Sequence, residues 1–272
     1  PLLFIGLRGI VAAFTLLPFA IMEQNRQRNL ALHSSNKFQA NQIPSGVFVS
    51  QSIAPFACAG GCIFFVAGSI QQMGIVTATV TNTGFLTALY IVFTPFLFWI
   101  FKRKVPSNIL WLSTCLAMAG VWALSGASVE GLTKGDMLVA VSSLFWALLI
   151  IVSGEAAKYK QPLSYTCFQF LWVGVLGLLA ASLLEVVDVK AIMDAADSVI
   201  YVGLLSTALT FGVMAYALQY VPAPRASILL SLETVFAAMA GHAWLGERLS
   251  AVGWFGATLI LSSVVVLQIQ RD

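Results

Sequence analysis

The stretch Arg225–Leu245, RASILLSLETVFAAMAGHAWL, is almost entirely apolar and carries one carboxylate, Glu233. Its length matches the roughly 20 residues that a helix needs to cross a bilayer. An acidic side chain at the centre of a span costs roughly 2.5–3.5 kcal/mol, and each large apolar neighbour offsets roughly 0.3–0.6 kcal/mol of this. The surrounding residues therefore compensate about one such charge, and the segment is predicted to span the membrane. A carboxylate in that place needs a partner, a proton or water.

The composition of the whole chain is that of a polytopic membrane protein. Of its 272 residues, 59% are hydrophobic and only 9% are charged, whereas about 25% are charged in a soluble domain. The mean hydropathy is +0.91. The net charge of +3 comes from basic residues in short connections between apolar runs, which favours membrane orientation over nucleic-acid binding. The four cysteines lie inside apolar runs without clustered histidine or carboxylate, so we expect no metal ion and no cofactor.

Nine apolar runs are predicted to be membrane helices: residues 2–22, 53–75, 77–101, 106–126, 137–154, 163–184, 199–220, 226–245 and 251–269. The polar stretch 23–52 is expected to be a long loop. Residues 213–222 align with 66–75 and residues 254–264 with 111–121, so the last four runs repeat the first four. The run 137–154 has no earlier counterpart. We therefore expect a five-helix unit used twice, with the first helix missing from this chain.

Two repeats of five helices must insert in opposite directions, because each contains an odd number of spans. The first repeat is expected over residues 1–126 and the second over residues 135–270. Inverted repeats of this kind are typical of secondary transporters, which bind substrate near the midplane between the repeats. When successive connections between the spans are assigned alternately to the two sides of the membrane, ten of the 14 Lys and Arg residues fall on one side and four on the other. The C-terminus lies on the more basic side and is predicted to be cytoplasmic.

Three segments resemble the EamA branch of the drug/metabolite transporter superfamily. They are GFLTALYIVFTPFLFWIFKRKVP at 84–106, GDMLVAVSSLFWALLIIVSG at 135–154, and residues 226–264 with LGERLS at 245–250. The resemblance implies ten helices in two inverted halves, a bacterial inner-membrane location, and transport of small metabolites such as amino acids, commonly outward. It also implies that the first, third, fourth, sixth, eighth and ninth helices surround a central cavity. It does not imply a substrate, because members differ widely in what they carry.

Polar side chains on the cavity-facing helices are the candidate substrate-binding residues. They are Gln72, with Gln71 beside it, Asn82, Thr83, Thr87, Tyr90, Ser142, Trp146, Tyr216, Gln219, Ser231 and Glu233. Amides, hydroxyls and aromatic rings together suit an organic substrate with polar ends. The spacing of Thr83, Thr87 and Tyr90 places them on one helix face. The alternative for the hydroxyl residues is structural, because Ser and Thr in membrane helices often bond their own backbone or a neighbouring helix.

Glu233 is the leading candidate, because an intramembrane carboxylate is a functional hypothesis by default. We expect it to bind substrate or to carry a proton during the transport cycle. The alternative is a structural carboxylic acid that bonds a neighbouring helix or pairs with Arg225. His242 falls on the opposite side of the helix and is expected to pack or to lie at the rim. The run Lys102–Lys104, KRK, is interpreted as an orientation signal that also contacts anionic lipid.

The function predicted is secondary transport of an amino-acid-like or drug-like metabolite, with export as the expected direction and proton coupling through Glu233 as one mechanism. The alternatives are an uncoupled exchanger or facilitator of the same superfamily, including a sugar-phosphate or nucleotide-sugar carrier, and a channel or structural membrane subunit. An enzyme is not expected, because the sequence holds no HExxH, GxSxG or phosphate-binding glycine loop. The partners expected are the substrate, the lipid bilayer and, in the coupled mechanism, protons. The sequence does not indicate an oligomeric state.

Overall fold

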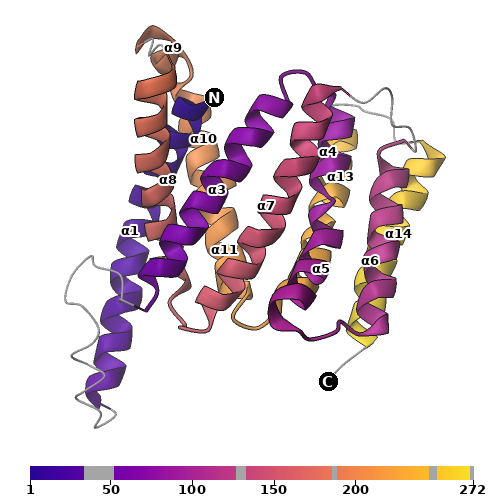
Figure 1. Cartoon of the computed structure of the whole chain (residues 1–272), viewed down its shortest axis with the longest axis horizontal. Coiled ribbons are helices and arrows are strands. Elements are labelled where there is room, and N and C mark those ends of the chain that lie inside the picture. The colour runs from indigo at the N-terminus through magenta and orange to yellow at the C-terminus, as the bar shows by residue number, and fades with distance from the viewer. Residues whose placement is uncertain (34–51, 127–132, 186–188, 245–249, 270–272) are drawn as a thin grey trace. The chain divides into compact units, whose positions relative to one another are not determined.

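The structure, a computed structural model, describes residues 1–33, 52–126, 133–185, 189–244 and 250–269, and every regular element in these ranges is helical (Figure 1). The elements are α1 (Leu2–His33), α3 (Ala54–Gly74), α4 (Val80–Thr87), α5 (Tyr90–Lys102), α6 (Asn108–Leu124), α7 (Lys134–Ala157), α8 (Pro162–Leu184), α9 (Val189–Asp194), α10 (Ala196–Tyr201), the π-helical η1 (Val202–Leu209), α11 (Thr210–Ala217), α12 (Ala223–Leu230), α13 (Leu232–Trp244) and α14 (Ala251–Ile269).

These elements make eight segments that are long and apolar enough to cross a membrane, and α6 is a further, shorter apolar helix. The prediction of an all-α polytopic membrane protein is confirmed. The predicted loop starts too early, however, because α1 continues past Met22 to His33. Near the start of the continuation, the Glu23 carboxylate accepts hydrogen bonds from the backbone N–H and the hydroxyl of Ser164, both at 2.8 Å. The extra turns of α1 therefore anchor the start of α8.

Two predicted spans are interrupted rather than continuous. The run 77–101 forms α4 and α5, separated at Ala88 and Leu89, and the run 226–245 contains α12 and α13, separated at Ser231. At the first interruption the backbone N–H of Leu89 bonds the carbonyl of Leu86, three residues back, at 3.3 Å. At the second, the N–H of Ser231 bonds the carbonyl of Ile228 at 3.1 Å, again three residues back. These tighter turns replace the α-helical bonds over one turn.

The two interruptions occupy equivalent places in the sequence. The segment LYIVF at 89–93 aligns with LETVF at 232–236, an offset of 143 residues. The same offset relates the first residues of α4 and α12 and also relates Tyr90 to Glu233. Tyr90 is the first residue of α5 and Glu233 the second residue of α13, and each lies near the middle of its span, Val80–Lys102 or Ala223–Ala243.

The chain divides into two compact units. Unit 1 contains Pro1–Ser69 and Val152–Tyr220, and unit 2 contains Ile70–Ile151 and Val221–Asp272. Neither unit coincides with a predicted repeat, because each takes helices from both halves of the sequence. Helices α3 and α7 each contribute one end to each unit.

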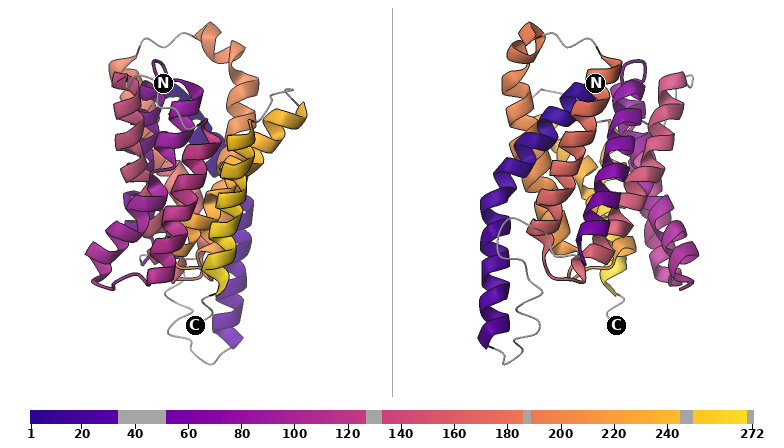
Figure 2. Two further views of the ribbon diagram at one scale, coloured as in Figure 1. Left: turned by 90° about the vertical axis from the view of Figure 1, so that its right-hand side faces the viewer. Right: turned by 60° about the vertical axis from the view of Figure 1, so that its left-hand side comes forward.

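In unit 1 the most extensive helix–helix contact joins α1 and α8, which run side by side in Figures 1 and 2. Glycines permit this contact, since a Cβ atom at Gly6 would lie 2.8 Å from the backbone nitrogen of Leu178. A Cβ atom at Gly177 would lie 2.5 Å from the Cα atom of Gly6. The two backbones therefore touch directly, as small residues allow in membrane helices.

In unit 2 the corresponding contact joins α6 and α14 (Figure 1). A Cβ atom at Gly120 would lie 2.7 Å from the carbonyl oxygen of Gly256, and a Cβ atom at Gly256 would lie 2.5 Å from the carbonyl oxygen of Gly120. Helix α5 packs against α12 and α6, and α12 also contacts α14. These contacts hold the two interrupted helices in one unit.

Candidate functional site

Within unit 2 the interrupted helices bring Tyr90 and Glu233 together. The Tyr90 hydroxyl donates a hydrogen bond to Glu233 Oε1 over 3.2 Å. Tyr90 is only 5% exposed, whereas the Glu233 side chain is exposed. The Thr94 hydroxyl donates to the Tyr90 carbonyl at 2.7 Å and so pairs a backbone oxygen close to the interruption. The exposed carboxylate therefore has one fixed donor and keeps its second oxygen available for another group.

A second polar contact lies at the end of α4. Thr87, the last residue of that helix, accepts a hydrogen bond from Gln71 Nε2 at 2.9 Å, and both side chains are half-buried. Of the two adjacent glutamines named as candidates, Gln71 is the one that makes this contact with Thr87. Gln72 is half-buried, and its role stays a prediction.

The candidate hydroxyls of unit 2 differ in what they contact. Ser231 Oγ donates to the carbonyl of Ile228 at 2.6 Å, and Ser142 Oγ donates to the carbonyl of Val139 at 2.7 Å. Both serines are fully buried, and these bonds are the structural alternative considered for them. Thr83 differs, because its hydroxyl is buried and has no hydrogen-bond partner in the part of the chain that the structure describes.

Asn82 and Trp146 lie elsewhere in unit 2. Asn82 is buried in the first turn of α4, beside the carboxylate of Asp136. Asp136 in turn accepts hydrogen bonds from the N–H and hydroxyl of Thr133, both at 2.8 Å. A helix of eight residues is about 12 Å long, so Asn82 stands well away from Tyr90 along its span. Trp146 is half-buried on α7.

The remaining two candidates belong to unit 1. Tyr216 is exposed on α11, and its ring centroid lies 5.6 Å from that of Tyr220. Gln219 donates to the carbonyl of Tyr216 at 3.3 Å. Both candidates therefore make their described contacts around the end of their own helix, and their roles stay predictions.

Unit 1 also contains a cation within the membrane-spanning helix α1, Arg8. The guanidinium carbon of Arg8 lies 5.2 Å from the ring centroid of Phe64 and 6.0 Å from that of Phe4, within the range of a cation–π contact. Gly68 leaves room for it, since a Cβ atom there would lie 3.2 Å from Arg8 Nη2. The Nε atom is buried without a hydrogen-bond partner among the described residues. The sequence does show a lone arginine in an apolar run, but a count of charged residues does not show which side chains that arginine contacts.

No set of three or more His, Cys, Asp or Glu residues in the described ranges is placed to hold a metal ion. What unit 2 offers instead is an interrupted helix pair with a carboxylate near the middle of a span. Discontinuous helices with polar groups at that depth are the usual substrate sites of secondary transporters. The class defined by this fold is therefore a polytopic helical membrane transporter.

Comparison with known proteins gives the family. Residues 133–269, about half of the chain, match the sequence profile of the EamA-like transporter family, and the chain belongs to this family. An uncharacterized transporter of Archaeoglobus fulgidus is 30% identical over 220 residues, covering 77% of this chain and 67% of the relative. The uncharacterized transporter YwfM of Bacillus subtilis is 28% identical over 209 residues, covering 75% of this chain and 68% of the relative.

A protein of known crystal structure shares the fold, with a TM-score of 0.71 and 14% sequence identity. The match covers 99% of this chain and 87% of the other. Together with the family, these relatives confirm the resemblance drawn from residues 84–106, 135–154 and 226–264.

Proposed function

We propose that the protein moves a small organic metabolite by alternating access, and that Glu233, held by Tyr90, binds the substrate and a proton in turn. The observation that carries the proposal is the 3.2 Å hydrogen bond between two residues that stand at equivalent interruptions of two membrane helices. Interrupted helices place polar side chains such as Tyr90 and Glu233 near the middle of their spans, the depth at which secondary transporters bind substrate.

The chemistry of one carboxylate favours exchange. An ionised Glu233 accepts the Tyr90 hydrogen bond and attracts a cationic group such as the amine of an amino-acid-like substrate. A protonated Glu233 loses that attraction and has an O–H of its own to donate. Because the proton and the amine compete for the same oxygen atoms, binding of one promotes release of the other. With an inward proton gradient this competition drives the metabolite outward.

The test uses the full natural chain in proteoliposomes that contain a pH-sensitive dye. Pools of amino acids and small amines are added, and proton movement is compared between the wild type, Glu233→Gln and the matched control Glu155→Gln. Glu155 lies at the far end of α7, in unit 1, where it forms an ion pair with Lys158 at 2.6 Å.

We expect substrate-dependent proton movement in the wild type and in Glu155→Gln, and none in Glu233→Gln. Proton movement that persists in Glu233→Gln would show that another group carries the proton. Substrate exchange without proton movement in any variant would replace the coupled mechanism with uncoupled exchange.

A further inference from the structure

A cavity of about 210 Å³ opens in unit 2 at the end of α5 that is remote from Tyr90. Its walls come from the last turns of α5, the connection to α6, and the residues at the start of α12. Among the lining residues are Phe98, Lys104, Ser107, Pro222, Pro224 and Arg225. We call it the basic pocket.

The charge of the basic pocket is positive. Lys104 and Arg225 line it, and the lining residues that the structure describes include no carboxylate. Lys104 makes no ion pair with any described residue. The pocket also holds the start of α6, where the Ser107 hydroxyl accepts from the N–H of Leu110 at 3.2 Å, and helix N-termini favour anions. Two cations beside a helix start suit a phosphate group, and the phenyl and proline walls suit the apolar part of the same molecule.

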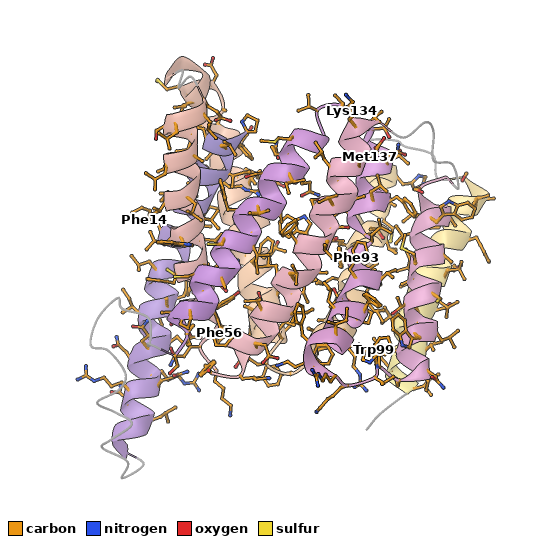
Figure 3. The ribbon with its side chains drawn as sticks, in the orientation of Figure 1. Phe14, Phe56, Phe93, Trp99, Lys134 and Met137 are labelled. Carbon is orange, nitrogen blue, oxygen red and sulfur yellow. The ribbon has the colours of Figure 1, made fainter. Side chains whose placement is uncertain are left out.

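The basic pocket lies where the spans end. The span Val80–Lys102 finishes at one wall, and the span Ala223–Ala243 begins at the other. Trp99, 41% exposed, lies near this end of α5 in Figure 3, a position typical of residues that anchor a helix at the lipid–water boundary. The boundary is the depth at which phospholipid phosphates lie. Clusters of Lys and Arg such as 102–104 mark the cytoplasmic side, and basic pockets between helices there bind anionic headgroups.

We propose that the basic pocket binds the phosphate of an anionic phospholipid, with Lys104 and Arg225 as its counter-charges. The occupant has a consequence for the rest of unit 2. Helices α5 and α12 contact each other, and their other ends carry Tyr90 and lead into Glu233. A phosphate held by both walls therefore fixes α5, which carries Tyr90, relative to α12, which directly precedes the helix of Glu233. The lipid site itself does not depend on the proposed transport mechanism.

The test measures lipid binding rather than transport. The purified protein is titrated in detergent with short-chain phosphatidylglycerol, with phosphatidylcholine of the same chains, and with inorganic phosphate, and binding is followed by native mass spectrometry and thermal unfolding. The variants are Lys104→Gln and Arg225→Gln. The control is Arg103→Gln, which removes the same charge from the neighbouring residue, an exposed arginine that does not line the pocket.

We expect phosphatidylglycerol to bind the wild type and Arg103→Gln equally, and each pocket variant about fivefold more weakly. Lys104 lies in a connection outside the helices, so its variant keeps the test valid if Arg225→Gln disturbs α12. Equal weakening in all three variants would refute a defined pocket. Stabilisation by inorganic phosphate as large as that by phosphatidylglycerol would assign the site to a free anion, and equal binding of phosphatidylcholine would refute recognition of the lipid's charge.

Discussion

The bond between Tyr90 and Glu233 makes a quantitative prediction about stability. Tyr90 is 5% exposed, so Tyr90→Phe keeps the buried ring in place and removes only the hydroxyl. At 3.2 Å the contact is longer than the usual O–H···O distance. Its strength is therefore expected in the lower part of the range measured for hydrogen bonds between membrane helices. Hydrogen bonds between membrane helices measured by double-mutant cycles average about 0.6 kcal/mol and reach about 1.7 kcal/mol. We therefore expect a coupling free energy of about 0.6–1 kcal/mol.

The measurement is the free energy of unfolding in mixed detergent micelles, followed by circular dichroism, which needs no substrate. Tyr90→Phe is combined with Glu233→Met, which removes the acceptor while keeping the length of the side chain. This double-mutant cycle subtracts the effect of each single substitution on the free energy of unfolding. The change in stability caused by removing the Glu233 carboxylate therefore cancels.

Glu233→Gln provides a graded control, since its amide oxygen still accepts a hydrogen bond from the Tyr90 hydroxyl. We expect Tyr90→Phe to cost nearly as much beside Gln as beside Glu, and much less beside Met. If Tyr90→Phe costs the same in all three backgrounds, the bond does not join the two interrupted helices and the reasoning from the site is refuted.

Three further changes test the packing, each by the same unfolding measurement. Gly256→Ala should cost about 1–3 kcal/mol, because its Cβ atom would lie 2.5 Å from backbone atoms of α6, whereas Gly84→Ala meets nothing within 4 Å and should be neutral or slightly stabilising. Glu23→Ala should cost about 1 kcal/mol by uncapping the start of α8, and the exposed Arg26→Ala should change stability by less than about 0.5 kcal/mol. Tyr165→Phe should cost about 1 kcal/mol, because it breaks a buried 3.0 Å bond to a serine of α7; no loss would mean that this hydroxyl is satisfied by water instead.

The spans were predictable because membrane insertion depends on composition over about 20 residues, which a sequence shows directly. The interruptions were not predicted, because the residues around Ala88 and Ser231 are mostly apolar helix formers. Pro95 does not mark the first, because the carbonyl that it crowds, four residues back, belongs to Ile91 within α5. Helix α13, which follows the second interruption, contains no proline. The Ser231 hydroxyl bonds the carbonyl of Ile228 in the preceding turn, one of several bonds that a serine in a membrane helix can make.

Part of the site was also predictable. Glu233 stood out by its charge in an apolar run, and Tyr90 by the polar face that it shares with Thr87. Their meeting depends on the packing of α5 against α12, which no local pattern reveals. The signal that could have shown it is the alignment of LYIVF with LETVF, which gives Tyr90 and Glu233 the same place in the two predicted repeats. Arg8 entered the sequence analysis only through the count of basic residues, because its aromatic neighbour Phe64 lies on a different helix.

The interleaving of the two units sets an order for biosynthesis. Unit 1 begins with the first residues of the chain but is complete only when Tyr220 has been made, and most of unit 2 is made in the interval. Until α8 is made, the glycine face of α1 lacks the helix that it contacts in the folded unit, and the close backbone contact between the two cannot form. If the two sequence halves were synthesised separately, neither half would contain all the helices of either unit, and both units would form only when the halves associate.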